Sequence, residues 1–523
     1  MNSVRHTILR GALTLVMLQF VGHLTELLKQ LMVASWFGTS GAMDAYLMAT
    51  AVVGLVQILI SRPIRQCLIP MFRHDLAQRG ETVAWFNVSI LFNNMAIVLL
   101  VLVVAGWFLS PYLVEALAPG FSEASQSLAS SLAQTTMISV IFMGMAGVLS
   151  QLLFSYRRFV LPGSAYGVNN IVVIATFLAL GGLYGIHGLA IAALAGSMTQ
   201  FLLQLPILWQ KRHFYCAKVD LRHPSMKEMA GLAFPALLSM SGKQISRVTD
   251  RIFASLLPVG SLSALGFASG LTTVLKEFIV EAPDQAIFPH LTKLSAEKKF
   301  SELSQQLFKY LRISFFISLP VGIGVMVLAE PIVRLVYQRG AFDETSVQIT
   351  SLALMFYAIG FPASAISTIL SRAFFGLKDT WTPTKVAFIR HGVRILLAWI
   401  LIGFLGHGGI ALADSLSVVI NGAFLFFWLP KELKGSEAWN TVRSFAQTVG
   451  ASIVMLGVVY FAKDSLFEHL NALTGFIALA LLGAATYAVL TVLMRRRDMI
   501  SLVVELAGSL FNGRLRKASL DNS

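Results

Sequence analysis

The chain alternates between long apolar runs and short polar segments over nearly its whole length. Apolar runs of about eighteen residues or more can cross a bilayer as α-helices. They are continuous, unlike the short alternating strands of a membrane barrel. The pattern therefore predicts an all-α polytopic membrane protein with about 14 transmembrane helices. These spans are predicted at residues 12–36, 45–71, 86–110, 131–155, 162–182, 187–209, 230–256, 263–289, 310–333, 347–371, 385–405, 409–429, 444–462 and 472–494.

The composition supports a membrane protein and narrows its function. Hydrophobic residues make up 56% of the chain and charged residues 13%, and the mean hydropathy is +0.73. The first apolar run continues past its early charges without a small-residue cleavage site, which indicates an uncleaved first span. Since the predicted loops leave no room for a soluble catalytic domain, we expect a protein that is not an enzyme and that needs no metal.

Basic residues gather in alternate connections, which predicts the orientation of the chain. The connections that hold most of the Lys and Arg residues are 73–81, 156–159, 210–227, 293–300, 375–385, 430–435 and the tail from 495. The positive-inside rule then places both termini in the cytoplasm. Topology and anionic headgroups account for the net charge of +14, so no nucleic-acid partner is expected.

The sequence repeats itself at an offset of about 220 residues. Residues 34–76 align with 254–295, and residues 182–208 align with 403–430. Two six-helix halves with an even number of spans have the same orientation, so they are expected to be pseudo-symmetric about the membrane normal, as in many transporters. The predicted domains are an N-terminal half at 1–215, a C-terminal half at 216–430, helices 13 and 14 at 431–495, and a cytoplasmic tail at 496–523 with an interfacial helix over 499–517.

Charged residues form stripes inside several predicted spans. In "GKQISRVTDRIFASLL" (242–257), Lys243, Arg247, Asp250 and Arg251 share one helical face. Four lipid-facing charges would cost on the order of 10 kcal/mol, so these groups must face protein or water. Four other predicted spans carry such stripes, formed by His23, Glu26, Lys29 and Gln30; Arg62, Arg65 and Gln66; Glu277, Glu281 and Asp284; and Arg390, His391 and Arg394.

Most of these stripes are cationic, which favours an anionic and phosphate-bearing substrate, because arginine pairs bind phosphate oxygens through charge-assisted hydrogen bonds. In the alignment of the two repeats, Arg62 and Arg65 occupy the positions equivalent to Glu281 and Asp284. Two interpretations remain open at this point. Either the opposite charges form ion pairs that lock one state of a transporter, or the cations bind substrate and the acids bind a coupling proton or monovalent cation.

Four segments resemble signature segments of the MurJ/MviN lipid II flippases, within the multidrug/oligosaccharidyl-lipid/polysaccharide flippase superfamily. They are "FGTSGAMDAYLMA" (37–49), "LAPGFS" (117–122), "IVRLVYQRGAFDETS" (332–346) and "SRAFFGLKDTWTPTK" (371–385). The resemblance covers essentially the whole chain. It implies a transporter that turns an undecaprenyl-pyrophosphate-linked saccharide to the outer leaflet by alternating access, in contact with membrane lipids and with glycan synthesis machinery.

The resemblance carries over to particular residues only in part. The family's first span has two cavity arginines, and their positions hold His23 and Lys29 here. Asp44 matches the acidic residue that follows the family's first periplasmic turn. These matches imply that the first span contributes one firm cation to the substrate site.

Spans 2 and 8 depart further from the family pattern. The arginine of span 2 is replaced by Gln57, with Arg62 and Arg65 one to two turns beyond it. The Arg and Glu pair of span 8 falls near Gly270 and Thr273. These departures leave an exopolysaccharide or other surface-glycan repeat unit open as an alternative to lipid II, and a multidrug or cation antiporter as a more distant one.

The stripes and the resemblance together predict two groups of functional residues. The predicted substrate-binding residues are His23, Lys29, Arg62, Arg65, Lys243, Arg247, Arg251, Arg390 and Arg394. The predicted coupling or gating residues are Glu26, Asp44, Asp250, Glu277, Glu281 and Asp284. No cofactor is expected beyond a coupling proton or monovalent cation.

Overall fold

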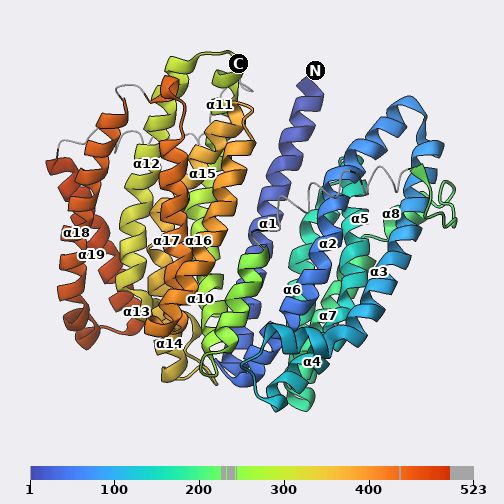
Figure 1. Cartoon of the computed structure of the whole chain (residues 1–523), viewed down its shortest axis with the longest axis horizontal. Helices are drawn as coiled ribbons and strands as arrows, with labels where there is room; N and C mark the ends of the chain where they lie inside the picture. Colours follow the sequence, from blue (N-terminus) through green and yellow to red (C-terminus); the bar gives the residue numbers. More distant parts are fainter. Residues whose placement is uncertain (1, 225–230, 232–241, 243, 435–436, 495–523) are drawn as a thin grey trace, which may run out of the picture. The chain divides into compact units, whose positions relative to one another are not determined.

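The computed structural model describes residues 2–224, 231, 242, 244–434 and 437–494 of the chain. Within these residues every regular element is a helix (Figure 1), which confirms the predicted all-α class. The predicted interfacial helix over 499–517 lies outside the described residues. The chain divides into two compact units, unit 1 formed by Met1–Gly266 with Tyr337–Ser346, and unit 2 formed by Phe267–Val336 with Val347–Ser523.

Unit 1 contains the helices of the first predicted half together with a helical stretch at 244–255. Long helices pack along their lengths, with α1 against α6, α6 against α7, and α2 against α3, α4 and α5. Its helices are α1 (Asn2–Phe37), α2 (Gly41–Gln78), α3 (Glu81–Leu117), α4 (Glu123–Met137), α5 (Ser139–Ser155), α6 (Val160–Tyr184), α7 (Ile186–Leu202) and α8 (Pro206–Gln210).

The helix α10 (Ser261–Lys276) starts in unit 1 and continues into unit 2. One apolar core of unit 2 joins α11, α12, α15 and α17, and a second joins α12 to α18 and α19, the two helices predicted as an addition to the repeat. The other elements of unit 2 are η1 (Glu277–Glu281), α11 (Ala282–Ala296), α12 (Phe300–Val327), α13 (Ala329–Tyr337), α14 (Glu344–Ala358), α15 (Phe361–Gly376), α16 (Trp381–Leu405), α17 (His407–Phe427), η2 (Lys431–Leu433), α18 (Glu437–His469) and α19 (Ala472–Leu493).

In the described part of the chain, ten helices are long and apolar enough to cross a membrane. An eleventh span results if α14 and α15, which are bent by 41° at their junction, count as one. The predicted count of 14 is therefore not confirmed. The three predicted spans that are missing from the ten and the bent pair are 12–36, 45–71 and 230–256. All three carry charged stripes, and part of the third lies outside the described residues.

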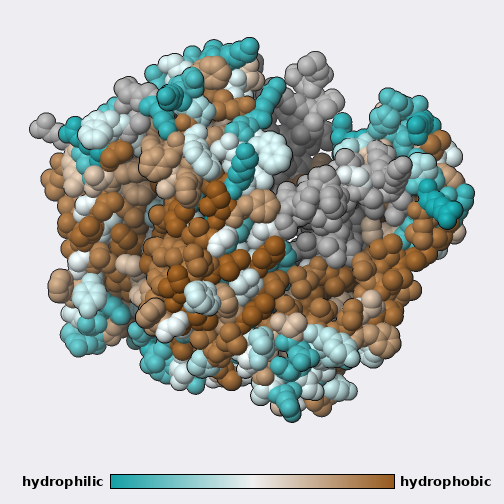
Figure 2. Space-filling model, viewed as in Figure 1, coloured by the Kyte–Doolittle hydropathy of each residue, from teal (hydrophilic) through white to brown (hydrophobic). Residues whose placement is uncertain are grey.

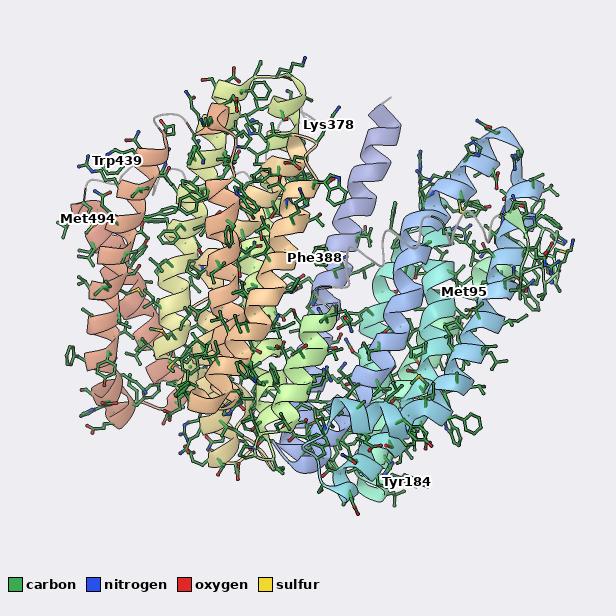
Figure 3. All side chains as sticks on the ribbon, viewed as in Figure 1. Met95, Tyr184, Lys378, Phe388, Trp439 and Met494 are labelled. Atoms are coloured by element: carbon green, nitrogen blue, oxygen red, sulfur yellow. The ribbon has the colours of Figure 1, made fainter. Side chains whose placement is uncertain are left out.

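The surface of the helices has the polarity expected in a bilayer. In Figure 2, hydrophobic atoms cover the middle of the helices and hydrophilic atoms gather toward their ends. Within unit 2, Lys378, Trp439 and Met494 all lie toward one end of the helices (Figure 3). The charge pattern predicts that the connections and helix ends with these three residues lie on the cytoplasmic side. Their common location at one end of unit 2 agrees with that prediction. Which side of the membrane this end faces stays a prediction.

The sequence repeat has a counterpart in local conformation. Gly185 joins α6 to α7 at φ 53° and ψ −128°, and Gly406, about 220 residues later, joins α16 to α17 at φ 54° and ψ −132°. Only glycine adopts this region without steric cost. The same tight turn therefore recurs at equivalent places in the two predicted halves, whose exact ranges stay a prediction.

Candidate functional site

The helices α1 and α6 approach each other closely at small residues. A side chain at Gly22 would collide with the ring of Tyr166, and Gly167 lies directly against Gly22. Small residues at such a crossing let two membrane helices bring their backbones together. This contact fixes the α1 charged stripe against the polar residues of α6.

A polar cluster, here called the α1–α6 cluster, forms at this crossing. The Lys29 ammonium lies 2.7 Å from the Glu26 carboxylate and donates to the Asn170 side-chain oxygen at 3.1 Å. The Tyr166 hydroxyl and the Gln30 amide also donate to Glu26, at 3.0 and 3.3 Å. The cluster holds one acid and one cation side by side, both about a quarter exposed, so their charges are balanced within the cluster.

The other groups of the first stripe lie around this cluster. The His23 ring meets the Tyr166 ring edge to face, with centroids 6.3 Å apart. The Tyr337 hydroxyl donates to the Gln30 oxygen at 3.1 Å, and Tyr337 is buried. The predicted residues His23, Glu26 and Lys29 are therefore brought together in one place.

The stripe of the seventh predicted span is described only in part. A guanidinium N–H of Arg251 donates to the Leu47 carbonyl of α2. Arg247 has an exposed side chain, and Asp250 is half-buried in the same helical stretch. Lys243 and the side chains of Arg62 and Arg65 lie outside the described residues, so their predicted roles stay predictions.

Asp44 caps the start of α10 from the first turn of α2. Its carboxylate accepts hydrogen bonds from the backbone N–H groups of Gly260 and Ser263, at 2.6 and 2.7 Å, and from the Ser263 hydroxyl at 2.6 Å. The Asp44 side chain is only 4% exposed. A buried carboxylate with three donors is held at one position, and its charge complements the positive end of the α10 dipole.

Two loops at equivalent positions of the repeat each contact a residue of the other predicted half. Gly340 lies so close to Ser35 that a side chain there would overlap the Ser35 carbonyl, and the Ala341 N–H donates to the same oxygen at 2.8 Å. Gly120 lies against the Ser255 carbonyl in the same way. Because Ser35 and Ser255 are aligned in the repeat, the two contacts are reciprocal. We call this group of contacts the crossover.

The connection from α13 to α14 contains a cap that holds the crossover loop. The Asp343 carboxylate accepts from the Ser346 N–H and hydroxyl, both at 2.8 Å, and the Ser346 hydroxyl contacts the Thr39 hydroxyl at 2.8 Å. Hydrogen bonds from the Ser346 backbone and side chain hold the pKa of Asp343 below its ordinary value. This loop is the end of the 332–346 signature segment.

In unit 2, Asp284 forms an ion pair with Arg372. The Arg372 Nε lies 3.2 and 3.0 Å from the two carboxylate oxygens, and a terminal nitrogen lies 2.8 Å from one of them. The guanidinium also stacks over the Phe288 ring at 4.7 Å. Asp284 thus has a bound cation inside its own unit, contributed by the 371–385 signature segment.

The acidic stripe of the eighth span lies on an irregular turn. Glu277 and Glu281 begin and end η1, a single π-helical turn between α10 and α11. Such turns are uncommon in helices and occur most often at functional sites. Glu277 is half-buried and Glu281 exposed.

The predicted arginines of α16 share one carboxylate from α17. Arg390 donates to one Asp414 oxygen at 3.2 Å, and Arg394 forms an ion pair with the same oxygen at 3.0 Å. Arg390 also donates to the Ser417 hydroxyl at 3.3 Å. All three charged side chains are largely buried. The structure therefore brings Arg390 and Arg394 together.

Several partners of the predicted residues were not found from the sequence, among them Tyr166, Asn170, Arg372 and Asp414. Asn170, which follows Asn169, and Asp414 are polar residues within apolar runs, a signal that could have marked them. Nothing in their local spacing connects either one to Lys29 or Arg390, because the contact depends on which helices pack together. Arg372 lies in the 371–385 signature segment, and its local spacing predicts no contact with Asp284.

Comparison with solved structures first defines the class of protein. A lipid II flippase MurJ in an inward closed conformation superimposes with a TM-score of 0.79 at 24% identity, covering 93% of this chain and 99% of that one. An inward-facing multidrug resistance MATE transporter of the MOP superfamily gives 0.66 at 16% identity, covering 81% and 95%. The chain therefore has the same helical fold as these two polytopic membrane proteins.

Sequence comparison then identifies the family. The family model described as lipid II flippase MurJ matches residues 33–482, so the chain belongs to the MurJ family. It is 27% identical over 471 residues to the lipid II flippase MurJ of Burkholderia cenocepacia, covering 86% of this chain and 89% of that protein. It is 24% identical over 524 residues to a probable lipid II flippase MurJ of Vibrio cholerae, covering 95% and 98%.

Proposed function

We propose that the chain moves lipid II, an undecaprenyl-pyrophosphate-linked saccharide, from the cytoplasmic to the outer leaflet of the bacterial inner membrane. The observation that carries this proposal is membership of the MurJ family over residues 33–482. Charged groups within membrane helices support it, since intramembrane charge usually marks a substrate or ion pathway. The transport is a change of leaflet without covalent chemistry, so the protein is not an enzyme.

The cationic side chains are proposed to bind the diphosphate of the substrate. Lys29 is the best-placed of the described residues, because its ammonium is held by Glu26 and Asn170 and is still about a quarter exposed. An ammonium on a flexible stem can pass from a carboxylate to a phosphate oxygen without a change of charge state. The remaining members of the proposed site are His23, Arg62, Arg65, Lys243, Arg247, Arg251, Arg390 and Arg394.

Asp44 and the crossover are proposed to close the outer end of the transporter. The buried carboxylate with its three hydrogen bonds joins the start of α2 to the start of α10. Opening at this end requires these bonds to break together, which makes Asp44 a gating residue. With both termini in the cytoplasm, this end faces the outer leaflet.

Glu277 and Glu281 are proposed to bind the coupling proton or monovalent cation, because they lie on a π-helical turn. A membrane potential contributes about 2.3 kcal/mol per charge per 100 mV, enough to bias the cycle if one charge moves. Glu26 and Asp250 are proposed to act with them. If the Glu281→Gln variant kept the pH and sodium dependence of the wild type, this coupling role would be wrong.

Lipid II is favoured over the alternatives for different reasons. The family model and both curated relatives are described as lipid II flippases, and none as an exopolysaccharide flippase. The multidrug transporter shares the fold at 16% identity, which carries no information on substrate. Membrane lipids and the glycan synthesis machinery are the expected partners.

Purified protein in liposomes that contain fluorescent lipid II tests the proposal. Lys29→Ala and Arg247→Ala should each lower the initial rate of translocation by about tenfold or more, since each removes a charge-assisted contact to phosphate. Arg443→Ala, which removes an exposed cation of α18, is the matched control and should keep the wild-type rate. Full activity of both site variants would contradict the cationic site.

A further inference from the structure

A short segment from the predicted second half of the chain lies along the last turns of α1. Residues Tyr337–Ser346 belong to unit 1, although the chain on either side of them belongs to unit 2. We call this segment the arm. The Tyr337 hydroxyl donates to the Gln30 side-chain oxygen at 3.1 Å, and two further contacts of the arm, at Ser35 and Thr39, belong to the crossover. The arm is therefore docked on α1 at three successive places.

Tyr337 is the residue through which the arm reaches the α1–α6 cluster. Its side chain is only 1% exposed and its ring packs against the Phe342 ring, with centroids 5.5 Å apart, so the hydroxyl is held at one position. The Gln30 oxygen accepts from this hydroxyl, and the Gln30 nitrogen donates to Glu26 at 3.3 Å. Because a primary amide has one acceptor end and one donor end, the bond from Tyr337 orients the nitrogen toward the carboxylate. A chain of two hydrogen bonds thus runs from the arm to Glu26.

The Glu26 carboxylate is shared between one cation and two neutral donors. Lys29 donates to it at 2.7 Å, the Tyr166 hydroxyl at 3.0 Å and the Gln30 amide at 3.3 Å. Each neutral donor stabilises the carboxylate, so less free energy is left to be gained from the ammonium. Loss of the Gln30 donor therefore strengthens the hold of Glu26 on Lys29.

We propose that Tyr337 is a positioning residue that makes the affinity of Lys29 for phosphate depend on the docking of the arm. While the arm is docked, Gln30 donates to Glu26, and Lys29 passes more easily to a phosphate oxygen. When the arm leaves α1, the Gln30 amide loses its orientation and Glu26 takes Lys29 back from the phosphate. This inference rests on the proposed function and adds Tyr337 and Gln30 to its site.

Such a link suits a transporter that loads its substrate on one side and releases it on the other. The arm carries contacts of the crossover, which is proposed to close the outer end, so a docked arm goes with a closed outer end. The diphosphate is then bound more tightly while the outer end is closed and more weakly once it opens. By thermodynamic reciprocity, a bound diphosphate favours the docked arm by the same factor.

Binding of inorganic pyrophosphate to the purified full chain in detergent, measured by calorimetry, tests the link. Tyr337→Phe keeps the buried ring and removes the hydroxyl. It should bind pyrophosphate about threefold to tenfold more weakly than the wild type, the effect of one hydrogen bond in the chain that ends at Glu26. In a Glu26→Gln background no carboxylate holds Lys29, so Tyr337→Phe should leave the affinity of that background unchanged.

Gln30→Met is the second test variant. It keeps the length of the side chain and removes both hydrogen bonds of the chain, so it should weaken pyrophosphate binding in the wild-type background and have no effect in the Glu26→Gln background. Its binding remains measurable even if Tyr337→Phe does not fold. Tyr487→Phe is the matched control, because it removes a buried hydroxyl that donates to the Phe316 carbonyl at 2.9 Å in unit 2. This control should bind pyrophosphate like the wild type.

A purely structural role of Tyr337 would weaken binding equally in both backgrounds or in neither, and either result would overturn the proposal. A wild type that bound no pyrophosphate would overturn it as well, since Lys29 would then have no phosphate to exchange for Glu26. The outcome is separable from the proposed function. If binding follows these expectations and lipid II is not translocated, the substrate assignment fails and the link stands. If lipid II is translocated and neither Tyr337→Phe nor Gln30→Met alters binding, the link fails alone.

Discussion

Three carboxylates of the helices, those of Glu26, Asp44 and Asp284, are held by specific donors. Glu26 has Lys29, Asp284 has Arg372, and Asp44 has two backbone N–H groups and a hydroxyl. A buried ion without such partners would be too costly to keep, so the donors define where each acid can function. A substitution of one of these acids therefore leaves its donor without an acceptor, and the effect on stability depends on that donor.

Asp44 gives the clearest stability prediction at this scale. Asp44→Ala leaves the N–H groups of Gly260 and Ser263 buried without their acceptor, which should reduce the free energy of unfolding by about 1–3 kcal/mol. Thermal unfolding of the purified variant measures the loss. Glu115→Ala, which removes an exposed acid of α3, is the control and should unfold like the wild type. If the two variants unfolded at the same temperature, the cap would contribute nothing to the folded state.

Asp343 gives a prediction for pH. Its pKa is lowered in the folded state by the Ser346 hydrogen bonds, so its stabilising effect is complete above the unfolded value of about 3.9 and is lost as the pH falls through the lower folded value. Asp343→Ala should cost about 1 kcal/mol at pH 7, as for other helix caps. Unfolding measured from pH 7 downward should show the two proteins converging below about pH 4. A difference in stability between the two proteins that persisted at this low pH would mean that the ionised Asp343 carboxylate is not the source of the stabilisation.

At the scale of elements, the hydropathy pattern predicts most helices, and tertiary contacts decide how they are broken. The span predicted at 347–371 is two helices, because Gly360 and Pro362 interrupt it and the chain bends by 41°. Pro362 could have signalled the break. The π turn at Glu277–Glu281 could not be read from the pattern, since the apolar and acidic residues around it also suit a regular helix.

The candidate site shows the same division between local and tertiary information. Helical spacing predicts that His23, Glu26 and Lys29 share a face of α1, and the structure brings them together. The partners Asn170 and Asp414 come from other helices, so no spacing within one span identifies them. The contacts of Asn170 and Asp414 are determined by which helices pack against each other.

The crossover gives a prediction for paired elements. Gly340→Ala should destabilise the protein strongly, because φ is 57° and the new Cβ would overlap the Ser35 carbonyl. Gly147→Ala in α5, where no neighbouring atom would be met, should be neutral or stabilising by up to about 1 kcal/mol. Thermal unfolding of the two variants measures the contrast. Equal stability would mean that the loop is free to move away from Ser35.

At the scale of the whole molecule, the family assignment and the internal repeat both point to a transporter. The repeat is visible in sequence, in the glycine turns at 185 and 406, and in the reciprocal contacts of Gly120 and Gly340. The substrate assignment comes from family membership, since proteins that share a fold can differ in their substrates. The central claim is therefore that lipid II itself changes leaflet.

Leaflet-resolved transport in cells depleted of their own lipid II flippase tests that claim most directly. Expression of this chain should restore growth and bring lipid II to the outer leaflet, and Lys29→Ala should restore neither. A well-expressed wild-type protein that left lipid II in the cytoplasmic leaflet would contradict the assignment and direct attention to another lipid-linked glycan.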